Sequence, residues 1–70
     1  MSKDLYKILG VNRTASDDEV RRAYKRKAKD THPDLHPGDA AKAEIFKSAS
    51  AAYEILGDKE KRGQYDRGEI

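Results

Sequence analysis

A chain of 70 residues is long enough for one small domain and too short for two. It contains no cysteine, which excludes a disulfide framework and a thiolate metal site and is typical of a reducing compartment, so we expect a cytoplasmic protein. Charged residues make up 40% of the chain but the net charge is only +2, so the positions of the charges say more than their sum.

The N-terminal segment predicts a short helix. Residues 1–4 lead into a mixture of polar and apolar residues, so neither a signal peptide nor a membrane span is expected. Asp4 is a good N-cap for a helix over residues 5–9, and Gly10 suits the left-handed position after a helix.

A second, longer helix is expected over about residues 17–30. Ser16 and Glu19 have the spacing of a capping box, in which the serine side chain caps the amide of Glu19 while the glutamate reaches back. Pro33 is the next stop signal, and residues 32–38 form the connecting loop.

The third helix is expected over residues 40–56, capped by Asp39 and ended by Gly57. This segment has six alanines and neither proline nor glycine. Its apolar residues recur at three- and four-residue steps: Ile45, Phe46, Ala49, Ala52, Tyr53 and Leu56. A fourth helix follows over about residues 59–65, with Asp58 as its cap.

The predicted fold is all-α and occupies residues 1–70 as a single domain. A short connection between two long amphipathic helices favours an antiparallel hairpin, with short helices at each end and the first helix laid across the apolar groove. Strand patterns and internal repeats are absent from the sequence.

The helix over residues 17–30 has one basic face. On a helical wheel its inward side holds Val20, Ala23, Lys27, Ala28 and Thr31, with Tyr24 at the margin. The opposite side holds Arg22, Lys25, Arg26 and Lys29, flanked by Arg21. Alone, such a run is more often a solvated surface than a binding site, but it leads directly into the loop, which favours recognition of an acidic partner surface.

His32-Pro33-Asp34 is displayed in that loop. The proline stiffens the peptide, so the imidazole and the carboxylate lose less entropy on binding. Asp34 is the best candidate to pair with a partner arginine. A loop whose polar side chains only bond to each other is the competing interpretation.

Matching segments extend over essentially the whole chain: Asp4-Leu5-Tyr6-Lys7-Ile8-Leu9-Gly10-Val11, Ala23-Tyr24-Lys25-Arg26, His32-Pro33-Asp34, Phe46, Ala52-Tyr53-Glu54-Ile55-Leu56, Asp58, Lys61-Arg62 and Tyr65-Asp66. In these segments the chain resembles the J domain of DnaJ-type co-chaperones, the partners of DnaK-type heat-shock ATPases. The resemblance implies a monomeric, non-enzymatic activator without catalytic residues, cofactor or metal, and the N-terminal domain of a longer protein whose other regions bind client polypeptides.

The resemblance also implies the partner-binding residues. Asp34 would engage an arginine of the chaperone, with His32 and Pro33 holding the loop geometry. The helix residues that would meet the acidic surface of the chaperone are Arg21, Tyr24, Lys25 and Arg26, with Lys47 as a weaker candidate. Phe46 is expected to pack and is a candidate for the site as well.

Four residues depart from the family pattern. Lys27 replaces the usual leucine, Thr31 a large aromatic residue, and Ala49 a larger aliphatic residue, so we expect a thin core. Leu35 stands where a basic residue is common, which leaves partner choice open. At the C-terminal end, Lys61, Arg62 and Asp66 are either surface charges or a clasp for the fourth helix.

Two alternatives have less support. A basic helix beside a turn is similar to a nucleic-acid-binding helix. The nearly balanced net charge argues against that function, and the acidic residues 17–19 would be repelled by phosphates. A metal site could use His32, His36, Asp34 and Asp39, but nothing in the sequence supplies the second shell of such a site.

Overall fold

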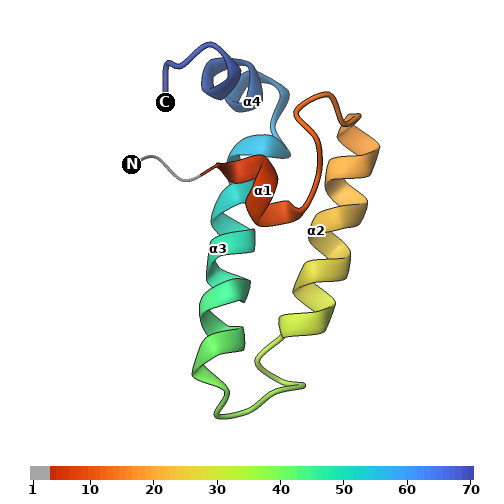
Figure 1. The fold of residues 1–70 in the computed structure, drawn as a ribbon, viewed down its shortest axis with the longest axis vertical. Helices are drawn as coiled ribbons and strands as arrows, with labels where there is room; N and C mark the ends of the chain where they lie inside the picture. The colour runs from red at the N-terminus through yellow and green to blue at the C-terminus, as the bar shows by residue number, and fades with distance from the viewer. Residues whose placement is uncertain (1–3) are drawn as a thin grey trace.

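The computed structural model describes residues 4–70, which form four helices and no strand (Figure 1). The helices are α1 (Leu5–Leu9), α2 (Asp17–Thr31), α3 (Ala40–Leu56) and α4 (Lys59–Asp66). The all-α prediction is confirmed, and α2 and α4 each end one residue later than expected. Residues 1–3, on which the expectation of no signal peptide partly rests, lie outside the described part.

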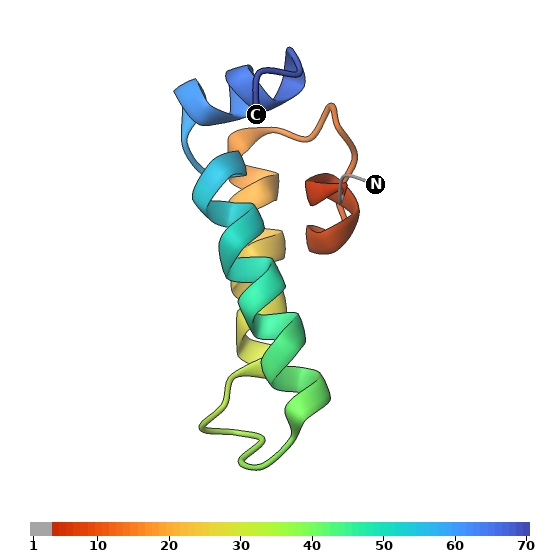
Figure 2. The ribbon, with the colours of Figure 1, turned by 90° about the vertical axis from the view of Figure 1, so that its left-hand side faces the viewer.

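The two long helices α2 and α3 form an antiparallel hairpin whose tip is the loop between them (Figure 1). α1 lies against the half of the hairpin away from the tip and packs mainly on α3. Seen from the side, α4 crosses the end of the hairpin opposite the tip (Figure 2). The loop and α4 are therefore at opposite ends of a molecule 38 Å long.

Each helix begins at a side-chain cap. The caps Asp4, Ser16, Asp39 and Asp58 each accept a hydrogen bond from a backbone amide two or three residues further on. In the predicted capping box, Glu19 accepts from the Ser16 hydroxyl at 3.3 Å. The four caps satisfy backbone donors that have no partner inside the helix.

The core is thin, as expected. Its buried residues are Tyr6, Leu9, Ala15, Val20, Ala49, Ala52 and Leu56, three of them alanines. Thr31 is also buried, and its hydroxyl donates to the Lys27 carbonyl at 2.7 Å. Ile45, which the apolar pattern of α3 included, is 42% exposed, because α1 covers only the far half of the hairpin.

Gly10 and Gly57 follow helices for different reasons. Gly10 has the expected left-handed backbone, with φ of 74°. Gly57 is right-handed, with φ of −82°, so it is not required for a left-handed cap. A Cβ atom there would lie 2.8 Å from the Tyr53 ring, and that close approach is what excludes a side chain.

Arg62 fastens α4 to the rest of the fold. Its side chain is only 13% exposed, and Nη1 donates to Asp17 Oδ1 at 2.9 Å. Nη2 donates to the carbonyls of Ala15 at 2.5 Å and Arg13 at 3.3 Å. We call Arg62 and these acceptors, together with Tyr6, the Arg62 clamp. Of the C-terminal charges, Arg62 therefore clasps α4, whereas Lys61 is exposed.

Tyr6 completes the clamp. The guanidinium of Arg62 lies 5.5 Å from the centre of the Tyr6 ring, and Nε donates to the Tyr6 hydroxyl at 3.2 Å. That hydroxyl donates to Asp66 at 2.5 Å. Burial and the bond to Asp66 raise the pKa of Tyr6 above its usual value of 10.0. Burial lowers the pKa of Arg62, but the bonds to Tyr6 and Asp17 outweigh it, so both groups keep their protons.

Candidate functional site

The tip loop, residues 32–39, is closed by its own backbone. His32 has an extended backbone, with ψ of 132°, as the following Pro33 requires. Its carbonyl accepts from the amides of Leu35 at 3.0 Å and His36 at 3.2 Å, and the His36 carbonyl accepts from Asp39 at 3.1 Å. The loop is therefore a hydrogen-bonded turn and not a slack connection.

The His32 side chain connects the loop to α3. Its ring meets Phe46 edge-on, with the ring centres 5.3 Å apart and the planes at 75°. Its Nδ1 accepts a hydrogen bond from the Asp34 amide at 3.1 Å. An accepting Nδ1 assigns the proton of a neutral ring to Nε2. His32 thus holds the peptide of Asp34 in place.

The Asp34 carboxylate is left to the solvent. Its side chain is 91% exposed, and its one ionic contact within residues 4–70 is with His32 Nδ1, at 3.8 Å. A neutral imidazole at that distance does not neutralise the carboxylate. The loop therefore presents a full negative charge on a fixed backbone, which suits a bidentate bond from a guanidinium.

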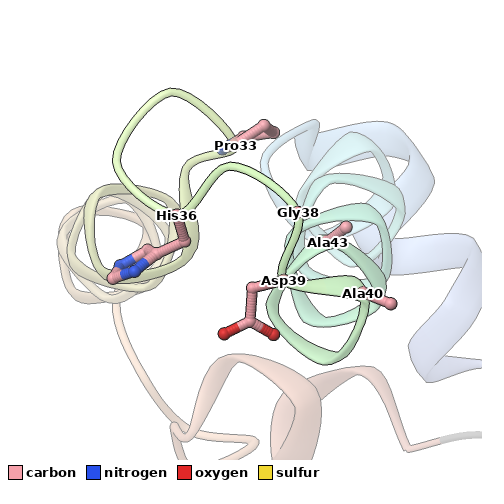
Figure 3. A pocket seen from close by; sticks show the side chains of 6 residues that line it. All are labelled: Pro33, His36, Gly38, Asp39, Ala40 and Ala43. Atoms are coloured by element: carbon pink, nitrogen blue, oxygen red, sulfur yellow. The ribbon is translucent and has the colours of Figure 1, made fainter.

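A shallow hollow lies beside Pro33 (Figure 3). It encloses about 250 Å³ and is lined by Pro33, His36, Gly38, Asp39, Ala40 and Ala43. Pro33 comes from the loop, whereas the two alanines come from the first turns of α3. The side of the tip next to the proline is thus mainly apolar.

The basic face of α2 is not uniform. Arg21 and Arg22 both pair with Asp18, each at 3.0 Å. Lys25 and Arg26 are exposed, and within residues 4–70 neither forms an ion pair. Uncompensated positive charge is therefore concentrated in the part of α2 nearer the tip, which the three- and four-residue spacing from Asp18 could have revealed.

Two other predicted site residues have partners within the fold. Tyr24 stacks on Tyr53 of α3, with the ring centres 4.3 Å apart and the planes within 3°. Lys47 is 76% exposed and lies 4.0 Å from Glu44. Neither lies in the tip loop, where the structure places His32, Pro33 and Asp34 and brings Phe46 of α3 against His32.

Two kinds of feature are not found in the described residues. Nowhere in residues 4–70 do three or more His, Cys, Asp or Glu side chains gather as a metal site would need. None of the helices there is long and apolar enough to cross a membrane.

Residues 4–66 match the model of the DnaJ domain family. The chain is 55% identical over 65 residues to the chaperone protein DnaJ of Wolbachia sp. subsp. Brugia malayi, covering 93% of this chain and 17% of that protein. It is 54% identical over 68 residues to the chaperone protein DnaJ of Thermoplasma volcanium, covering 96% of this chain and 19% of that protein. The chain thus spans less than a fifth of these relatives.

A solved structure has the same arrangement of helices. The crystal structure of the J-Trx1 fragment of ERdj5 matches with a TM-score of 0.87 and 37% identity, covering 97% of this chain and 33% of that one. This likeness confirms the fold expected from the sequence.

Proposed function

This chain belongs to the DnaJ domain family, and we propose that it binds the ATP-bound form of a DnaK-type heat-shock chaperone and accelerates its ATP hydrolysis. Hydrolysis then retains a client polypeptide on the chaperone. The nucleotide site belongs to the partner, so the domain itself is an activator and not an enzyme. In this proposal it acts as a monomer in the cytoplasm, and clients bind regions outside this chain.

The observation that carries the proposal is the state of Asp34. Its carboxylate is 91% exposed, while its amide is fixed by His32 Nδ1 at 3.1 Å. A charge on a fixed backbone and without a strong internal partner has little to lose when a partner arginine binds it. Phe46 supports the site from α3 by packing against His32.

The basic face supplies the longer-range attraction. Lys25 and Arg26 carry charge that no described residue pairs, so they would steer the domain toward an acidic surface of the chaperone. We propose that the interface includes His32, Pro33, Asp34, Arg21, Tyr24, Lys25, Arg26 and Lys47. Arg21 would exchange its exposed bond to Asp18 for a partner carboxylate, which costs little in water.

The test is single-turnover ATP hydrolysis by a purified DnaK-type chaperone, with the domain and with Asp34→Asn. We expect the parent to accelerate hydrolysis and the variant to lose about tenfold or more of that acceleration, because its amide offers one acceptor oxygen and no charge. Asp30→Asn is the matched control, because it removes an exposed carboxylate from the end of α2 without touching the loop.

Three results would count against the proposal in different ways. No stimulation by the parent, across several such chaperones, would remove the activator role. Stimulation that survives Asp34→Asn would keep the role but move the critical contact to the basic face. Tight binding to generic duplex with a steep salt dependence would instead favour the nucleic-acid alternative.

A further inference from the structure

Leu35 is the most exposed large apolar side chain in residues 4–70. It is 61% exposed, compared with 57% for Ile70 and 42% for Ile45. Single exposed apolar residues are common on protein surfaces, so exposure alone carries no argument. The position of Leu35 is the informative feature, because this residue follows Asp34 directly in the tip loop.

The backbone of Leu35 is held in place. Its amide donates to the His32 carbonyl at 3.0 Å, and the next amide, of His36, donates to the same oxygen at 3.2 Å. Pro33, on the other side of Asp34, has a restricted backbone because of its ring. Asp34 therefore has an exposed apolar residue on each side along the chain, with neighbouring Cα atoms about 3.8 Å apart.

Apolar neighbours can strengthen the ion pair that an exposed carboxylate forms with a partner. In water, an ion pair at Asp34 would be weak, because solvent screens it and competes for its hydrogen bonds. If the partner also covers Pro33 and Leu35, water is excluded around the pair and the attraction increases. The same contacts remove apolar surface from water.

We infer that Leu35 and Pro33 form an apolar rim around Asp34, and that the partner arginine lies beside an apolar patch of the chaperone surface. This inference rests on the proposed function and specifies the chemistry of the docking surface. A folded protein can offer a cation for Asp34, an apolar patch for Leu35 and carboxylates for Lys25 and Arg26. A nucleic acid offers phosphates to the basic face but no cation to Asp34.

The experiment compares Leu35→Gln, which is similar in size but polar, with Leu35→Met, which stays apolar. The readout is the domain concentration that gives half-maximal stimulation of ATP hydrolysis by the same DnaK-type chaperone, at low and at moderate salt. Ile70→Gln is the control, because Ile70 is nearly as exposed but follows α4 at the opposite end of the molecule.

We expect Leu35→Gln to raise the half-maximal concentration about fivefold. The increase should be larger at moderate salt, because the ion pair between Asp34 and the partner arginine is then less protected from water and salt. Leu35→Met should stay close to the parent, as should Ile70→Gln. The urea midpoint of every variant should stay unchanged, since these side chains are exposed.

The outcomes separate the two levels of the proposal. A parent that stimulates and a Leu35→Gln variant that is equally potent would overturn the apolar rim and leave the activator role intact. Leu35→Met weakening as much as Leu35→Gln would also overturn it, because shape would then matter and not apolarity. A parent that fails to stimulate would refute the proposed function and the rim with it.

Discussion

The two ends of the α2–α3 hairpin differ in whether their key charged group is bonded within the fold. At the α4 end, Arg62 is 13% exposed and donates to four oxygens of the chain. At the tip, the Asp34 side chain is 91% exposed, and in the described part of the chain its one ionic contact is with His32 Nδ1, at 3.8 Å. The first arrangement stabilises the fold, whereas the second leaves a charge available to a partner.

This difference explains how so small a chain can hold a rigid tip without burying it. The α4 end secures α1, α4 and the start of α2 through the hydrogen bonds of the Arg62 clamp, since a core with three alanines contributes little. The tip is held by backbone hydrogen bonds, by the bond from the Asp34 amide to His32 Nδ1 and by the contact of His32 with Phe46. Mutations at the two ends should therefore affect different measurements.

Arg62→Ala should have the largest effect. We expect a loss of about 3 kcal/mol in the free energy of unfolding, because the carbonyl of Ala15, the hydroxyl of Tyr6 and Asp17 all lose a charged donor. Urea unfolding measures it. The control is Arg67→Ala, whose pair with Glu69 is 62% and 51% exposed and should change stability by less than about 0.5 kcal/mol.

The same Arg62→Ala variant tests whether the ends are independent. At a temperature where it is folded, its stimulation of a DnaK-type chaperone should equal that of the parent. A folded variant with impaired stimulation would show that the clamp and the tip are coupled.

Gly57→Ala should destabilise the domain by about 2 kcal/mol. The new Cβ would lie 2.7 Å from the Tyr53 carbonyl and 2.8 Å from its ring, so Tyr53 would have to leave its stack with Tyr24. Thermal unfolding checks the sign, which is opposite to the gain usual for this substitution in a right-handed backbone.

Gly63→Ala is the matched control for that experiment. Its Cβ would meet only the flexible end of Arg67, at 3.1 Å, and the residue lies inside α4. We expect a gain of about 0.5 kcal/mol from helix propensity. If both variants lost the same free energy of unfolding, the close approach of Tyr53 would not be the reason that position 57 requires glycine.

Lys27→Leu should have a smaller effect than Arg62→Ala or Gly57→Ala, a gain of about 1 kcal/mol. Lys27 is half-buried between the two ends, at a hollow of about 300 Å³ lined also by Ile8, Glu44, Ile45 and Ser48. A leucine would cover more of that apolar surface without losing a described ion pair. Urea unfolding should show no such gain for Lys25→Leu, which is exposed on the same helix. A lower midpoint for Lys27→Leu would mean that its ammonium group is needed.

Local signals in the sequence were sufficient for the helices and for the tip. Asp4, Ser16, Asp39 and Asp58 mark the helix starts because capping needs only residues two or three positions apart. Pro33 marks the loop because its effect on the backbone is local as well. The display of Asp34 follows from these two facts.

Other features depended on residues that are distant in the sequence. Arg62 joins Asp17 across 45 positions and Tyr6 across 56, so no local pattern could decide between a surface charge and a clasp. The same holds for Tyr24, which the helical wheel left at the margin and which α3 places in a stack with Tyr53. Ile45 fits the apolar period of α3, but it is exposed because α1 is too short to cover it.

The sequence by itself therefore determined the elements, their order and the residues displayed at the tip, because propensity, capping and proline act within one turn of chain. Only the tertiary structure decided which charged side chains bond to other groups within the fold. Whether a cation finds an oxygen at bonding distance depends on how helices far apart in the chain pack together, and that packing made Arg62 structural and left Lys25, Arg26 and Asp34 exposed.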